Sequence, residues 1–123
     1  MNIYDCFMYF DEDLILDLRL NMLDEYVKKF VITESTYLHS GKEKKLNFDP
    51  KNFIKFRDKI EYIVVDRLPD GIQEVDKNDT VDVKNKKILD NSVRRENNQR
   101  NMQIKGLSSA HDEDLILSSD LDE

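Results

Sequence analysis

Four short apolar runs divide the chain and predict the strands of a sheet. They are rich in β-branched and aromatic residues, as buried strands usually are, and they cover residues 3–10, 30–34, 60–65 and 114–118. The third of them, Ile-Glu-Tyr-Ile-Val-Val, is the most hydrophobic stretch of the chain. We therefore expect four strands, separated by segments of other character.

The residues between the first two runs show the periodicity of a helix. Apolar residues recur there at the spacing of one helix face, and polar residues recur at the same spacing on the opposite face. The apolar positions are Leu16, Leu20, Leu23 and Val27. The pattern predicts a helix over residues 14–29. Pro50 is suited to the first turn of a second, short helix before the third run.

The segment between the third and fourth runs has no sustained period. Residues 68–87 hold a proline, a glycine and many Asp, Asn and Lys residues, so we expect a long polar connection there. Asp90 or Asn91 could then cap a helix that runs to about Leu107. The alternation of strands and helices predicts an α/β fold, with a mostly parallel sheet flanked by helices, and residues 1–123 are expected to form one domain.

Composition narrows the class of protein. The chain has 26 acidic and 19 basic residues and a formal net charge of −7, which argues against a nucleic-acid partner because phosphate backbones bind basic surfaces. No stretch approaches the ~18 apolar residues of a membrane span, and the first residues do not resemble a signal peptide. Cys6 is the single cysteine and cannot form an internal disulfide. We therefore expect a cytoplasmic protein without a membrane span.

The last residues carry the strongest candidate chemistry. Ser-Ser-Asp-Leu-Asp-Glu directly follows the fourth run. Alternation along a strand would place Asp120 and Asp122 on the same side, where both could face one cation, and carboxylates are suitable ligands for Mg²⁺ or Mn²⁺. The alternative is an acidic terminus without a ligand, since this spacing also occurs by chance in acidic proteins.

Four further charged residues are candidates for a ligand site. Asp5 lies inside an apolar run, where a carboxylate is costly to bury without a partner, and Glu34 ends the second run at the edge where ligands usually bind. Each is either near a ligand or a structural acid that holds a loop or turn. Arg95 and Arg100 could neutralise a diphosphate, since guanidinium groups match phosphate oxygens, or could belong to a solvated helix face.

Several separated segments carry a more specific signal. They are residues 3–10, 18–21, 30–36, 95–101 and 119–123. In this order they resemble family-17 glycosyltransferases, the relatives of the β-1,4-mannosyl-glycoprotein β-1,4-N-acetylglucosaminyltransferase. The resemblance implies the N-terminal, Rossmann-like nucleotide-binding half of a GT-A-type fold.

The resemblance also implies a reaction and its components. The donor would be a UDP-sugar, with UDP-GlcNAc expected, and the acceptor a glycan. Mn²⁺ or Mg²⁺ would bridge the diphosphate to Asp120 and Asp122 and would stabilise the charge of the departing UDP.

The remaining candidate residues receive roles from the same resemblance. Asp5 and Glu34 would lie near the nucleoside, and Arg95 and Arg100 near the diphosphate or against the acidic loop.

An inverting transfer also needs a base for the acceptor hydroxyl, which the resemblance implies beyond residue 123. We therefore expect a chain truncated after its Asp-x-Asp motif, with little or no transfer of its own. Two other functions stay open: a non-catalytic α/β interaction domain whose acidic end is only a tail, and a metal-dependent phosphohydrolase-like domain that uses Asp5.

Overall fold

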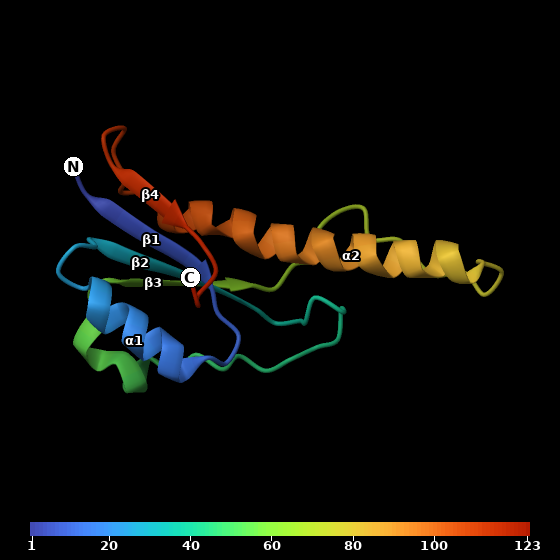
Figure 1. Cartoon of the computed structure of the whole chain (residues 1–123), viewed down its shortest axis with the longest axis horizontal. Helices are drawn as coiled ribbons and strands as arrows, with labels where there is room; N and C mark the ends of the chain where they lie inside the picture. Colours follow the sequence, from blue (N-terminus) through green and yellow to red (C-terminus); the bar gives the residue numbers. More distant parts are fainter.

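A four-stranded parallel sheet with helices on both faces forms the centre of the computed structural model, which describes all 123 residues (Figure 1). The strands are β1 (Ile3–Met8), β2 (Lys29–Ser35), β3 (Ile60–Val65) and β4 (Leu115–Ser118). Their order in the sheet is β3-β2-β1-β4, and every neighbouring pair is parallel. This confirms the predicted α/β class, and the order matches the first four strands of the Rossmann sheet.

The two central strands explain why the apolar runs were continuous. β1 and β2 each have neighbours on both sides, and nearly all their residues are buried. A strand covered on both faces needs apolar residues at successive positions rather than at alternate ones. β4 lies at the edge of the sheet, and all four of its residues are exposed.

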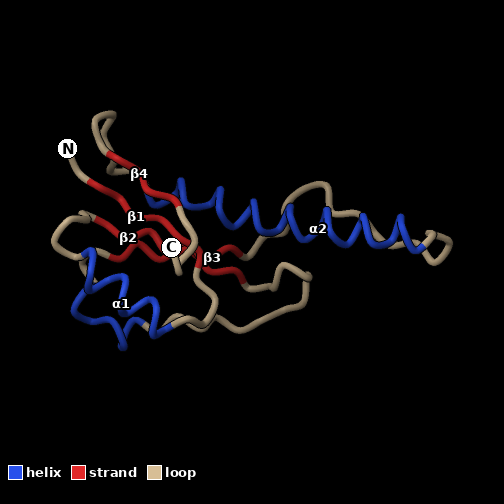
Figure 2. Tube along the Cα trace, viewed as in Figure 1, coloured by secondary structure: helices blue, strands red, loops and turns tan.

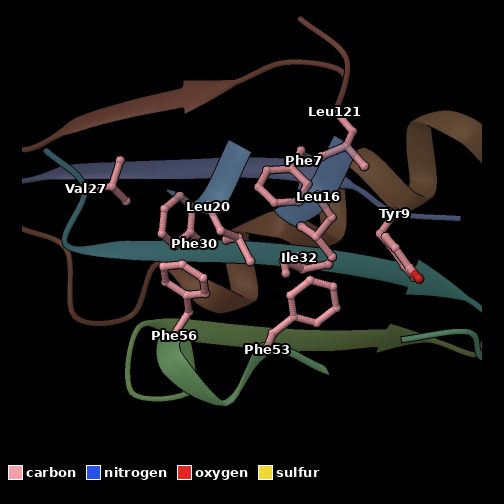
Figure 3. Close-up of a cluster of buried hydrophobic side chains, with 10 residues drawn as sticks. All are labelled: Phe7, Tyr9, Leu16, Leu20, Val27, Phe30, Ile32, Phe53, Phe56 and Leu121. Atoms are coloured by element: carbon pink, nitrogen blue, oxygen red, sulfur yellow. The ribbon is translucent and has the colours of Figure 1, made fainter. Parts of the chain in front are cut away.

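One face of the sheet is covered by α1 (Asp13–Leu23) and the short 3₁₀ helix η1 (Pro50–Phe56). Leu16 and Leu20 of α1 pack into the main cluster of buried apolar side chains (Figure 3). The helix ends at Leu23, short of the predicted end at residue 29. The apolar spacing continues past this end because a turn after α1 also carries Val27 into the core.

The opposite face is covered by α2 (Val81–Asn101) and the 3₁₀ helix η2 (Met102–Gly106). The predicted start of this helix at Asp90 or Asn91 is wrong, because Thr80 is the cap and its Oγ1 accepts a hydrogen bond from the amide of Val83 at 3.2 Å. The irregular connection predicted for residues 68–87 accordingly ends before α2. Asn91 instead exchanges two 2.8 Å hydrogen bonds with the backbone of Gln73 and holds that connection against the helix.

Gly106 sets how closely η2 approaches the sheet. A Cβ atom at this position would lie 2.5 Å from Cγ1 of Val31 in β2, which is too close for any other residue. Val31 belongs to a second small cluster with Tyr4 and Cys6 of β1. Burial raises the pKa of the Cys6 thiol to about 12, and the neighbouring charge of Asp5 adds to the shift.

The first half of α2 projects beyond the end of the sheet (Figures 1 and 2). Its residues there are mostly exposed, whereas the second half packs beside β1 and β2. Neither α2 nor any other helix combines the length and the apolar composition needed to cross a membrane.

Candidate functional site at the carboxyl ends of the strands

A cavity of about 470 Å³ lies where β1, β2 and β4 end. Residues that follow these three strands line it, and α2 adds Glu96 and Gln99 from the side. The chain leaves β1 toward β2 on one side, whereas β4 is added on the other side. This change of direction opens a crevice at the carboxyl ends of parallel strands, which is the usual ligand site of such sheets.

The acidic residues of the chain end form a turn beyond β4. The amide of Glu123 donates to the carbonyl of Asp120 at 3.1 Å, and the amide of Asp120 donates to Oε2 of Glu123 at the same distance. Leu121 is buried in the main cluster beside Phe7 (Figure 3). We call residues 119–123 the acidic loop.

Asp120 and Asp122 both line the cavity. They lie in a turn, however, and not in the strand that we predicted. Strand alternation does not place them, because β4 ends at Ser118. They flank the buried Leu121 in the turn and remain exposed on either side of it. Asp122 has no hydrogen bond or ion pair, so its carboxylate is available to a ligand.

The acidic loop could contribute carboxylates to a cation only if other ligands complete the coordination. No group of three or more His, Cys, Asp or Glu side chains is arranged to hold a metal ion, so the chain does not build a complete cage of its own. Mg²⁺ sites beside phosphates commonly use only one or two carboxylates, and substrate oxygens and water complete the coordination. Asp120 and Asp122 are two exposed acidic residues that line the cavity, and they are the candidates for such ligands.

Arg100 contacts the acidic loop directly. Its Nη2 lies 3.3 Å from Oδ1 of Asp120 and 3.4 Å from Oε1 of Glu96, and all three side chains are substantially exposed. Exposed ion pairs of this length contribute little to stability. The guanidinium group can therefore be drawn to another anion at small cost.

Arg95 is engaged elsewhere. Its Nη1 donates to the carbonyl of His39 at 2.9 Å, and its guanidinium group lies against Gly41. A Cβ atom at Gly41, whose φ is +93°, would lie 2.7 Å from Cζ of Arg95. Arg95 thus shapes the turn that brings His39 to the cavity, and its own side chain does not line that cavity.

Glu34 is buried and anchors the loop after β2. It accepts four hydrogen bonds, from the amides of Asn47 and Phe48 at 2.6 and 3.1 Å, from Nζ of Lys44 at 2.8 Å and from the hydroxyl of Tyr62 at 2.6 Å. Burial and this carboxylate together raise the pKa of Tyr62. Glu34 does not line the cavity, but Lys44 does.

Asp5 is also buried, and one arginine occupies both of its oxygens. Nε of Arg19 donates to Oδ2 at 2.8 Å, and Nη2 donates to Oδ1 at 2.7 Å. A carboxylate held in this way is a poor nucleophile, so the geometry speaks against a phosphohydrolase that uses Asp5. Arg19 was missed as a site residue, although its position three residues after Leu16 puts a charge beside the apolar face of α1 and Asp5 is a carboxylate in need of a partner.

Two neutral polar residues in the cavity wall were also missed. Ser35 is the last, buried residue of β2, and its Oγ has no hydrogen-bond partner. Gln99 reaches over from α2 and donates to the carbonyl of Thr33 at 3.0 Å. A serine at a strand end and a glutamine in a polar helix give no distinctive sequence signal.

Comparison with known proteins identifies a family. A family model described as Glycosyltransferase family 17 matches residues 1–123, which include all four strands and the acidic loop. No curated protein and no solved structure matches the chain.

Proposed function

The chain belongs to glycosyltransferase family 17, and on that premise we propose that it binds the donor of a metal-dependent glycosyl transfer in the cavity at the carboxyl ends of β1, β2 and β4. Membership in the family supports a transferase that uses a nucleotide sugar and a glycan acceptor. The observation that carries the finer proposal is that Asp120 and Asp122 line this cavity on either side of a buried leucine.

Asp120 and Asp122 are the residues that would hold Mn²⁺ or Mg²⁺. The ion, when bound, supplies Lewis-acid stabilisation of the charge on the departing nucleoside diphosphate. Asp122 brings a free carboxylate, and Asp120 brings one that shares only a long contact with Arg100. Arg100 can exchange this contact for an oxygen of the diphosphate, since its guanidinium group is exposed.

The cavity suits a nucleotide sugar, with UDP-GlcNAc as the proposed donor. Its volume of about 470 Å³ lies within the range of small-ligand sites. Ser35 supplies a buried hydroxyl without a partner for a donor hydroxyl or base. Asp5, Glu34 and Arg95 do not line the cavity, so their contribution to donor binding is through the loops that they hold. An inverting mechanism and little or no transfer by this chain alone stay predictions.

Thermal unfolding tests the proposal. Mn²⁺ with UDP or UDP-GlcNAc at millimolar concentration is expected to raise the Tm, because a ligand present at 100 times its Kd stabilises the native state by about 2.7 kcal/mol. Asp120→Ala/Asp122→Ala should abolish the shift. Asp112→Ala/Glu113→Ala is the matched control: it removes two exposed acids near the other end of β4 and should keep the shift.

Two results would contradict the proposal. One is the absence of any shift in the wild-type chain at millimolar Mn²⁺ and nucleotide. The other is a shift of equal size in the Asp120→Ala/Asp122→Ala variant, which would place the ligand elsewhere.

A further inference from the structure

Arg19 of α1 donates hydrogen bonds to the acidic loop. Its Nη1 donates to the backbone carbonyls of Asp120 at 2.7 Å and of Leu121 at 3.1 Å. Its Nη2 donates to Oγ of Ser119 at 2.6 Å. One side chain from a distant part of the sequence therefore contacts three successive residues of this loop.

Asp5 fixes the orientation of Arg19. The carboxylate takes Nε and one hydrogen of Nη2, and the guanidinium group lies 4.7 Å above the ring of Phe7. Asp5 is fully buried, and the Arg19 side chain is only 10% exposed. The guanidinium group is planar and rigid. Because one of its edges is bonded to Asp5, its remaining N–H groups point in fixed directions toward the acidic loop.

We infer that Arg19 is a positioning residue that sets the conformation in which the acidic loop presents Asp120 and Asp122 to a divalent cation. The inference rests on the proposed function, because it takes these two residues as the metal ligands. Arg19 acts through backbone carbonyls and Ser119, so both aspartate carboxylates stay free of it.

Asp5 contributes a second effect. An arginine behind a cation site would repel the cation if its charge were unbalanced. The buried ion pair with Asp5 compensates that charge, so Arg19 can hold the loop without adding net positive charge beside the metal ligands.

The simpler explanation is that Arg19 only neutralises Asp5. Asp5→Leu/Arg19→Met separates the two explanations, because a buried pair that is replaced by apolar residues of similar size often leaves stability unchanged, whereas loss of one partner does not. A counter-ion becomes dispensable in this double variant, but a positioning residue does not. Arg19→Lys is a second variant, since it keeps the charge and loses the planar fork.

The experiment has two measurements. Isothermal titration of Mn²⁺ with UDP is expected to give a Kd at least about tenfold weaker in the double variant and in Arg19→Lys, the usual size of effects from residues that orient metal ligands. Amide hydrogen exchange of residues 119–123 without metal should be faster in both variants, because Arg19 no longer holds the loop. Leu20→Ala is the control: it destabilises the same helix from the core side, and should change neither quantity.

The outcomes distinguish a failure of the role of Arg19 from a failure of the proposed function. If the double variant keeps the wild-type Kd and the wild-type exchange of the acidic loop, Arg19 is only a counter-ion and the inference is overturned. If exchange accelerates but the wild-type chain binds no Mn²⁺ with UDP, the role in loop conformation holds and the proposed function fails. If Leu20→Ala shows the same losses, general destabilisation is the cause and the inference is again overturned.

Discussion

Two pairs of acidic residues, one within the central strands and one in the acidic loop, differ in burial and in bonding. Asp5 and Glu34 lie within strands and are completely buried, and each is bonded to one cationic side chain. Asp120 and Asp122 lie in a turn and are exposed. Only the second pair lines the cavity at the ends of β1 and β2.

The difference lies in how the lone pairs of the carboxylates are used. Glu34 accepts four hydrogen bonds and Asp5 is held by a planar fork, so neither can bind a ligand without breaking structure. Asp122 has no partner at all. The two buried carboxylates therefore have structural partners, whereas the exposed pair keeps lone pairs that a ligand could use.

Removal of Glu34 should have the largest effect on stability. Glu34→Ala leaves the ammonium group of Lys44, which is only 10% exposed, without its partner, and we expect a loss of about 3–5 kcal/mol in the free energy of unfolding. Urea denaturation followed by circular dichroism measures this loss. Glu61→Ala is the control, because it breaks the half-exposed pair with Lys29 and should cost at most about 1 kcal/mol. Equal losses in the two variants would remove the distinction between the buried and the exposed acids.

Loss of a single donor to Glu34 should have an intermediate effect. Tyr62→Phe is expected to cost about 1.5–3 kcal/mol, the usual contribution of a hydrogen bond to a charged group. Burial and Glu34 raise the pKa of Tyr62 in the folded chain. The stabilisation by its hydroxyl is therefore complete below the ordinary tyrosine pKa of about 10. It is lost as the pH rises toward the pKa of the folded state.

The difference between wild type and Tyr62→Phe should therefore shrink above pH 10, as measured by urea denaturation from pH 7 to 11. Tyr26→Phe, at a tyrosine that is 63% exposed, should show no cost at neutral pH. A difference for Tyr62→Phe that grows with pH would contradict the burial of its hydroxyl against Glu34.

Asp122→Asn should have the smallest effect. The carboxylate has no partner, so the free energy of unfolding is expected to change by no more than about 0.5 kcal/mol. Chemical denaturation without metal measures it. A loss comparable to that of Tyr62→Phe would show that Asp122 is a structural acid like Glu34.

The strands could be predicted because the residue types on either side of each apolar run mark where the strand begins and ends. Each apolar run is bounded by charged or turn-forming residues, and the four strands match the predicted runs within about two residues at each end. The order of the strands in space was not accessible in this way. The placement of β4 beside β1 depends on contacts between distant residues, such as the hydrogen bond from Ser119 to the carbonyl of Cys6.

The start of α2 was predicted wrongly because a long-range contact uses the residue that looked like a cap. Asp90 and Asn91 are residue types that favour caps, yet the side chain of Asn91 serves a long-range contact with the backbone of Gln73. Thr80, a weaker cap by type, takes the position because Val83 and the residues after it can continue the helix from there.

The position of the acidic residues could be predicted because they directly follow an apolar run, and the structure brings Asp120 and Asp122 to the cavity at the strand ends. Their role as metal ligands stays a prediction. Arg19 was not predicted, because one arginine in an amphipathic helix looks like a surface residue until the fold brings Asp5 beneath it.

The buried thiol of Cys6 in β1 can report how often the central sheet opens. Only the thiolate reacts with alkylating reagents, and Cys6 is inaccessible in β1 with a pKa near 12. Modification of this single cysteine must therefore wait until β1 leaves the sheet. The rate of alkylation then reports how often the centre of the domain opens, and looseness that is confined to the acidic loop does not affect it.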